Sequence, residues 1–305
     1  MFLRIDRLQV EMPLPKEPDP VAAAAVQELM GGRFGEMTTL NTYMFQSFNF
    51  RQREKLRPFY ALIANIATEE LGHIELVGAA VNGLLNGMEP KGDMSKGEPS
   101  FAGMFSGAAL KSHVAPGPHA GIMCADSLGN PWKGDYIFNS GNLILDLLHN
   151  FFLENGARTA KLRAYQLTTN PAARRMLGYL FTRGGVHAHA YALVLKKLTG
   201  VEIEKMLPTP NINLDKIPEC HKYLGEGKHR LLYTNSPSDY KAMAGIWGNG
   251  ETALPGDPPG ELEVVEGVPD GGRIPELAGM PPAFTPDYAP EEMFEVAQKL
   301  YKMSR

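Results

Sequence analysis

Four segments with helical periodicity, each about thirty residues long, constrain this 305-residue chain more than any other feature of its sequence. They cover residues 21–49, 59–86, 142–169 and 172–199. The pairs Asp19-Pro20 and Asn170-Pro171 each combine a capping side chain with a proline suited to a first helical turn. Ser140 offers a cap for the third segment. At 1.5 Å per residue, each helix spans about 40 Å.

The connections between the segments predict how the helices pair. Short connections join the first segment to the second and the third to the fourth, so each pair forms a hairpin. Residues 88–140 are rich in glycine, proline and methionine without a sustained period, which favours a long crossover. Two hairpins joined by one crossover between helices two and three indicate an all-α, ferritin-like four-helix bundle over residues 1–200.

The remaining residues, 201–305, predict a C-terminal extension with short elements. Residues 250–286 are rich in proline and glycine, and PEEMFEVAQKLYKM predicts a terminal helix. The extension has too few apolar runs for an independent core, so we expect it to wrap the bundle or neighbouring subunits.

Composition excludes several classes of protein. A formal charge of -4 and a pI near 6.1 argue against a nucleic-acid or anionic membrane surface. The sequence has no apolar run long enough for a membrane span, and its start lacks the apolar region of a secretory signal. The two cysteines, Cys124 and Cys220, are too few for a disulfide framework, which favours a reducing compartment. We expect a cytoplasmic protein.

One motif in the second segment carries metal-binding chemistry. In ATEELGHIELV, Glu70 and His73 stand three residues apart, which places both side chains on one face of a helix. A Glu-x-x-His pair in a bundle core is the building block of di-iron and di-manganese carboxylate sites. Glu69, four residues before His73, competes with Glu70 for that face.

The other ligands are found by reflection, because residues equally far from a hairpin turn come level with each other. Glu36 lies opposite Glu70 across the first turn, and Glu154 lies opposite His187 across the second. The predicted ligands are therefore Glu36, Glu70, His73, Glu154 and His187. Carboxylates and imidazoles without thiolates suit manganese or iron. A carboxylate can bridge two ions that share one small substrate, and Glu70 is the expected bridge.

Glycines crowd the predicted ligands, although each glycine inside a helix costs about 1 kcal/mol relative to alanine. They are Gly35, Gly72, Gly156, Gly184 and Gly185. Missing side chains leave room for a narrow substrate cavity or, alternatively, for tight helix packing alone. The sequence does not decide between these two interpretations.

The stretches RFGEMTTLNTYMFQ, ATEELGHIELV, FLENGARTAKLRAY and TRGGVHAHAY resemble the manganese catalases, non-haem enzymes of the ferritin-like superfamily. The resemblance extends over most of the chain. It implies two manganese ions per subunit, one held by Glu36 and His73, the other by Glu154 and His187, with Glu70 bridging. It further implies disproportionation of hydrogen peroxide to water and dioxygen, and a homohexamer whose tails embrace neighbouring subunits.

The sequence departs from some family members in two places. An acidic residue three positions before the last histidine is replaced by Gly184, so a carboxylate proton shuttle is missing there. Aspartates that bind calcium in some members correspond to Ala61 and Asn65, so no calcium is expected. Tyr43 matches a family tyrosine that hydrogen-bonds a ligating carboxylate. Lys161 supplies charge or protons near the site, unless it is an ion-paired surface lysine.

Two other interpretations stay open at this point. A di-iron peroxidase or ferroxidase would share the bundle, but such iron sites usually carry two Glu-x-x-His pairs, and Gly184 breaks the second. A structural or coat relative would keep the bundle without metal, although the five ligand residues are all present. The family pattern favours Glu70 over Glu69 as ligand, leaving Glu69 as a hydrogen-bond acceptor beside the site or a solvated charge.

Overall fold

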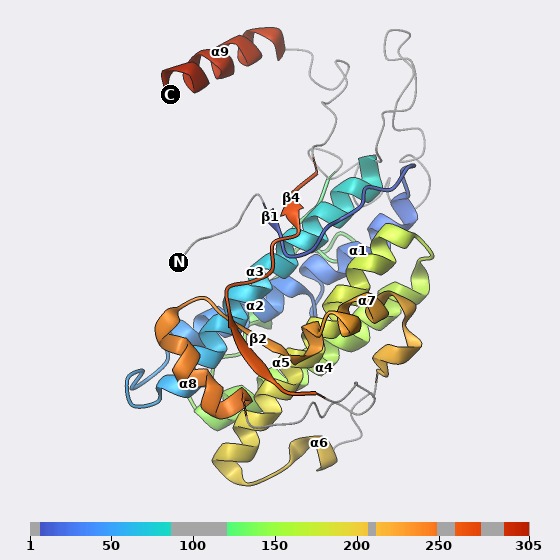
Figure 1. The fold of residues 1–305 in the computed structure, drawn as a ribbon. Coiled ribbons are helices and arrows are strands. Elements are labelled where there is room, and N and C mark those ends of the chain that lie inside the picture. The colour runs from blue at the N-terminus through green and yellow to red at the C-terminus, as the bar shows by residue number, and fades with distance from the viewer. Residues whose placement is uncertain (1–6, 87–120, 207–211, 249–259, 276–289, 305) are drawn as a thin grey trace.

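A computed structural model describes residues 7–86, 121–206, 212–248, 260–275 and 290–304 of the chain (Figure 1). The long helices are α1 (Pro20–Gly31), α2 (Glu36–Phe48), α3 (Arg57–Asn86), α4 (Leu143–Leu167) and α5 (Pro171–Thr199). In this bundle α2 packs against α3, α4 against α5, and α1 against both α3 and α4. The predicted four-helix bundle is confirmed, while residues 88–120 of the predicted crossover lie outside the described residues.

The first predicted helix is wrong in one respect, because it is divided into α1 and α2. Gly32 has an extended backbone with ψ of 162°, which ends α1, and α2 starts afresh after Gly35. A Cβ on Gly35 would lie 2.8 Å from the carbonyl oxygens of Leu29 and Met30, so only glycine permits this tight connection. The break places Glu36 in the first turn of α2 with its side chain buried.

The helix starts follow the predicted caps except at α4. The side chains of Asp19 and Asn170 accept hydrogen bonds from backbone amides of α1 and α5 respectively. The prediction that Ser140 caps α4 is wrong, because the side chain of Asn142 caps it. The hydroxyl of Ser140 instead donates to Asp146 at 2.7 Å, which ties the incoming chain to the first turn of the helix.

The C-terminal extension consists of short elements and one longer terminal helix. Its helices and turns are α6 (Ile203–Met206), η5 (Leu214–Lys216), η6 (Pro218–Cys220), α7 (His221–Gly225), η7 (Lys228–Arg230), α8 (Pro237–Trp247) and α9 (Pro290–Met303). Strand β2 (Leu231–Thr234) pairs in parallel with β3 (Glu263–Glu266), and β1 (Arg7–Leu8) pairs antiparallel with β4 (Gly272–Arg273). The predicted terminal helix is thus confirmed as α9, which Figure 1 draws away from the bundle.

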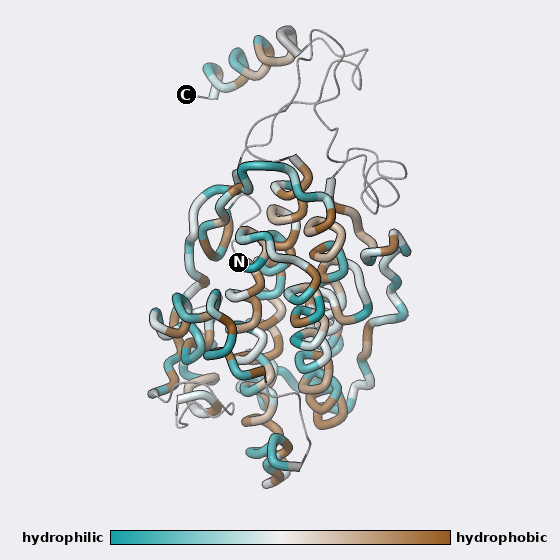
Figure 2. The backbone as a smooth tube through the Cα atoms, turned by 90° about the vertical axis from the view of Figure 1, so that its right-hand side faces the viewer, coloured by the Kyte–Doolittle hydropathy of each residue, from teal (hydrophilic) through white to brown (hydrophobic). Residues whose placement is uncertain are grey.

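Two hydrophobic clusters form the core, and the extension contributes to both. Tyr223 joins the cluster that α1 shares with α3 and α5, whereas Trp247 and Val264 join the cluster around α2, α3 and α4. Hydrophobic stretches recur along the long helices in Figure 2. Residues 212–248 and 260–264 of the extension therefore contribute buried apolar side chains to the core, whereas those of α9 are exposed. Among the described helices, none combines the length and the apolar character that a membrane crossing requires.

The segment that leads from the crossover into α4 packs against α1. The amide of Gln27 donates to the carbonyl oxygens of Met123 and Ala125, at 2.8 and 2.7 Å. A Cβ on Gly31 would lie 2.5 Å from the backbone carbonyl carbon of Ala125. Residue 31 must therefore be glycine for the two backbones to approach this closely.

We predict that Gly31→Ala lowers the free energy of unfolding by about 1–3 kcal/mol, because the new methyl group collides with backbone that cannot yield easily. Gly78→Ala in α3 is the matched control. Its methyl group would meet only Met30 Cε at 4.0 Å, so the higher helix propensity of alanine should raise stability by up to about 1 kcal/mol. Urea unfolding measures both. A Gly31→Ala protein as stable as the unaltered chain would contradict the proposed contact.

Candidate metal centre

The five side chains predicted as ligands converge in the middle of the bundle. They come from four of the five long helices: Glu36 from α2, Glu70 and His73 from α3, Glu154 from α4 and His187 from α5. Each is at most 1% exposed. Ligand atoms of Glu70, His73 and His187 lie within 4.8 Å of one another, close enough to share a metal ion.

Glu70 stands between the two imidazoles. Its Oε1 lies 2.7 Å from Nδ1 of His187, and its Oε2 lies 3.0 Å from Nδ1 of His73. Glu36 approaches His73 Nδ1 to 3.6 Å, and Glu154 approaches His187 Nδ1 to 3.5 Å. The arrangement thus has two halves, one with Glu36 and His73 and one with Glu154 and His187, and Glu70 faces both.

Several buried polar atoms of the cluster have no hydrogen-bond partner among the described residues. They include Glu36 Oε2, His73 Nε2 and both ring nitrogens of His187, whose carboxylate neighbours do not meet hydrogen-bond geometry. Leaving a buried polar group unsatisfied costs about 1–3 kcal/mol, and more for a charged one. Cations bound between these atoms would remove that cost, so the donor set fits a metal site.

The electrostatics of the cluster also favour positive charge. Burial raises the pKa of Glu154, and the nearby charge of Glu70 raises it further. Burial alone would lower the pKa of His73, but contacts with Glu70, Glu36 and Glu69 raise it well above its ordinary value. The carboxylates therefore stabilise bound protons, and a divalent cation would compete with those protons for the same atoms.

Two hydroxyl groups orient the carboxylates. Tyr43 donates to Glu154 Oε1 at 2.7 Å, and Thr39 donates to Glu70 Oε2 at 3.0 Å. Burial, together with the charge of Glu154, raises the pKa of Tyr43 well above its ordinary value, so the phenol keeps its proton. Thr39 was not predicted, although its position three residues after Glu36 places it on the same face of α2.

Lys161 lies inside the cluster, so the interpretation of a surface lysine is wrong. It is 2% exposed, and its Nζ is 2.8 Å from Glu36 Oε1. Burial lowers its pKa, but the charges of Glu36, Glu70 and Glu154 outweigh burial and raise it. The ammonium group therefore stays charged beside the carboxylates.

Gly184 adjoins the same cluster. A Cβ at this position would lie 3.3 Å from Arg158 Cγ and 3.9 Å from Glu154 Oε2. Gly156 faces the ring of Phe34, to which a Cβ would come within 2.6 Å. At Gly35 and Gly156 close packing accounts for the glycine, which supports the packing interpretation at these two positions.

Glu69 is buried and does not behave as a solvated charge. Arg183 donates to both of its carboxylate oxygens, at 2.6 and 3.0 Å. Although burial by itself would raise the pKa of Glu69, the charge of Arg183 and contacts with His187 hold it well below its ordinary value. Arg183 was not predicted, yet it stands four residues before His187 on the same face of α5.

Comparisons with known proteins identify relatives. A family model described as "Manganese containing catalase" matches residues 1–305. A manganese catalase of Bacillus subtilis is 30% identical over 269 residues, which cover 88% of this chain and 92% of the relative. An uncharacterised protein of Bacillus subtilis (strain 168) is 35% identical over 68% of this chain and 74% of its own length. The crystal structure of KatB, a manganese catalase from Anabaena, matches with a TM-score of 0.53 at 21% identity, covering 87% and 98% of the two chains.

These comparisons bear on the fold as well. The match to the Anabaena structure agrees with the predicted ferritin-like helical fold. It extends beyond the bundle, since it covers most of both chains. The predicted resemblance to a family is confirmed by the model that matches the whole chain.

We predict that Lys161→Met lowers the free energy of unfolding of the metal-free protein by about 3 kcal/mol, because it leaves the Glu36 carboxylate buried without its counter-charge. The control is Lys196→Met, which removes a lysine 2.6 Å from Glu202 on the exposed surface. That change should alter stability far less, because solvent screens an exposed pair. Equal effects of the two substitutions on chemical unfolding would contradict the role of Lys161.

Proposed function

We propose that the buried cluster is the metal centre at which this chain, which belongs to the family of manganese-containing catalases, carries out the reaction of that family. The chain is a non-haem catalase that converts hydrogen peroxide to water and dioxygen at a manganese centre. The observation that carries the proposal is the buried group of Glu70, His73 and His187, whose ligand atoms lie within 4.8 Å of one another.

We infer that the centre holds two manganese ions per chain. Glu36 and His73 would hold one ion, Glu154 and His187 would hold the other, and Glu70 would be shared between them. The two oxygens of Glu70 support this assignment, because each faces a different imidazole, at 2.7 and 3.0 Å. When bound, the manganese pair supplies the two-electron redox chemistry that peroxide disproportionation requires.

The surrounding residues orient the ligands and supply positive charge beside them. Tyr43 fixes the orientation of Glu154 through its 2.7 Å hydrogen bond. Lys161 supplies positive charge beside the centre, because its ammonium group lies 2.8 Å from Glu36 and its raised pKa keeps it protonated. The burial of all these groups excludes bulk water, which strengthens the electrostatic effect of the lysine on a small substrate.

We also propose a homohexamer in the cytoplasm. Two exposed apolar groups support association: Met293, Phe294 and Leu300 on α9, and the adjacent rings of Phe45 and Phe48 on α2. Exposed apolar residues grouped in this way mark contact surfaces between proteins. The number six comes from the family resemblance. Free cysteines, with Cys124 exposed, agree with a reducing compartment.

Metal analysis and oxygen evolution test the proposed function together. The purified chain is expected to contain two manganese ions and to release dioxygen from hydrogen peroxide. Glu70→Ala should abolish both the manganese pair and the activity, whereas Glu54→Ala, which alters an exposed carboxylate, should change neither. Iron without dioxygen release would favour the di-iron alternative, and a metal-free, inactive protein would favour a structural relative. Either result would overturn the proposal.

The oligomer is tested by light scattering coupled to size-exclusion chromatography. The chain is expected to elute with a mass near six times 33.4 kDa. Met293→Ser combined with Leu300→Ser should lower that mass, because both exposed apolar side chains lie on one face of α9. Lys299→Ser on the same helix is the control. A hexamer that survives the double substitution would contradict a role for α9 in assembly.

A further inference from the structure

Glu69 faces the side of both imidazoles that points away from Glu70. Its Oε2 lies 3.0 Å from Nε2 of His187, and its Oε1 lies 3.6 Å from Nε2 of His73. The His187 contact is a close approach that does not meet hydrogen-bond geometry. Each imidazole is nevertheless enclosed between two carboxylates, with Glu70 at Nδ1 and Glu69 at Nε2.

Arg183 fixes the position and the charge of Glu69. Its guanidinium group donates to both carboxylate oxygens, and the side chain is fully buried in α5. An ionised carboxylate can only accept hydrogen bonds, so Glu69 can hold His187 through its Nε2–H once Nδ1 is bound to a metal, while it faces His73 Nε2 from 3.6 Å. Nδ1 of each imidazole points toward Glu70, where a metal would bind, and Nε2 points toward Glu69.

The C-terminal extension holds the other side of the Arg183 guanidinium group. Nη1 donates to the carbonyl oxygens of Lys228 and Leu231, at 2.5 and 2.7 Å. The ring of Tyr233 lies over the guanidinium group, with its centroid 4.2 Å from Cζ. Trp247 in α8 donates to the carbonyl oxygen of Arg230 at 2.9 Å and so anchors the segment. The extension thus determines where Arg183 points.

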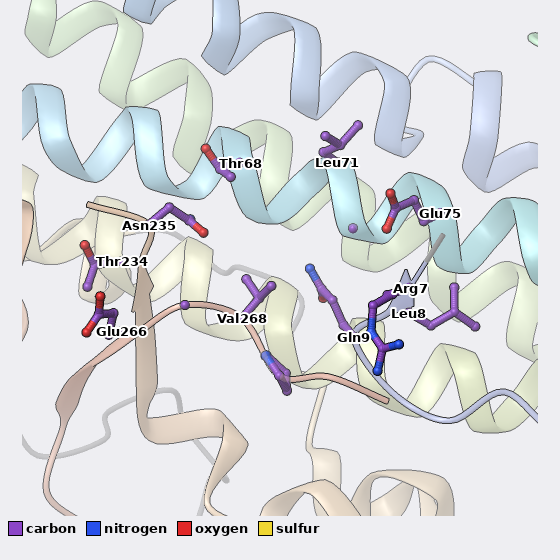
Figure 3. Close-up of a pocket in the computed structure, with 13 residues that line it drawn as sticks. Arg7, Leu8, Gln9, Thr68, Leu71, Glu75, Thr234, Asn235, Glu266 and Val268 are labelled. Carbon is purple, nitrogen blue, oxygen red and sulfur yellow. The ribbon is translucent and has the colours of Figure 1, made fainter. Parts of the chain in front are cut away.

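The N-terminal segment holds the backbone at the same turn of α3. The side-chain amide of Gln9 donates to the carbonyl oxygen of Glu69 at 2.9 Å, and Tyr179 donates to Gln9 Oε1 at 2.9 Å. Gln9 and the extension residues Thr234 and Asn235 line one cavity of ≈ 200 Å³ beside this turn (Figure 3). Segments from both ends of the chain therefore meet at Glu69.

We propose that Glu69 and Arg183 are a positioning pair for the two histidine ligands. Residues 228–233 of the extension hold the Arg183 side chain, and through it Glu69, in place beside the metal centre. The proposal rests on the proposed function of the cluster and adds a role for the extension. The pair touches neither the metal nor the substrate. It acts through the orientation of His73 and His187, because Glu69 lies against Nε2 of both rings.

The test measures manganese binding by calorimetry, starting from the full chain freed of metal with a chelator and titrated with manganese chloride. Glu69→Gln, which keeps the size of the side chain and removes its charge, should weaken binding about 10–100-fold. Arg183→Lys should weaken it too, because a lysine cannot contact both oxygens and both carbonyl groups at once. Tyr233→Leu alters only the extension and should cause a smaller, severalfold loss.

Glu219→Gln is the matched control. Glu219 accepts a hydrogen bond from Tyr165 at 2.7 Å, away from the histidines, and its loss should leave manganese affinity unchanged. Circular dichroism and thermal melting of each metal-free variant report folding separately. If the substitutions at Glu69 and Arg183 prevent folding, the manganese affinity of Tyr233→Leu tests the proposal instead. Lower melting temperatures with unchanged manganese affinity in the folded variants would show a structural pair only and overturn the inference.

The two proposals fail in different ways. If the unaltered chain binds no manganese, the proposed function is overturned, and this inference with it. If the unaltered chain binds manganese and Glu69→Gln binds it equally well, only the positioning role is overturned.

Discussion

Burying four carboxylates in the core of a helical bundle is the constraint on which the rest of this structure depends. A buried charge is costly unless it is paired, and Glu36, Glu69, Glu70 and Glu154 are each at most 1% exposed. Lys161 lies 2.8 Å from Glu36, and Arg183 contacts both oxygens of Glu69. Two carboxylates, Glu70 and Glu154, lack a comparable cation among the described residues, and they adjoin the imidazoles where metal ions are proposed to bind.

The backbone is arranged to bring these charges together. The break between α1 and α2 starts a new helix at Glu36, so the carboxylate enters the core from a first helical turn. The glycines on either side of that break allow the connection to stay tight. The extension contacts the site from outside the bundle, because the carbonyl oxygens of Lys228 and Leu231 accept hydrogen bonds from Arg183. Fold and site are therefore not separable: the segments that cover the bundle also fix the groups around its centre.

Much of this arrangement follows from sequence, because helix periodicity and hairpin symmetry are local properties. The four helices and the convergence of the five ligand candidates were predicted from spacing and turn positions alone. The break at Gly32 was missed, since a glycine inside a periodic segment does not by itself end a helix. Arg183 was not predicted, and the burial of Lys161 was left undecided, for a different reason. Their partners lie on other helices or in the extension, and no single segment of sequence records such a contact.

The most direct measurement of the central claim is the anomalous scattering of manganese in crystals of the metal-loaded chain. Two anomalous peaks are expected on opposite sides of the Glu70 carboxylate, one adjoining Glu36 and His73 and the other adjoining Glu154 and His187. A single peak, or peaks away from these side chains, would contradict it.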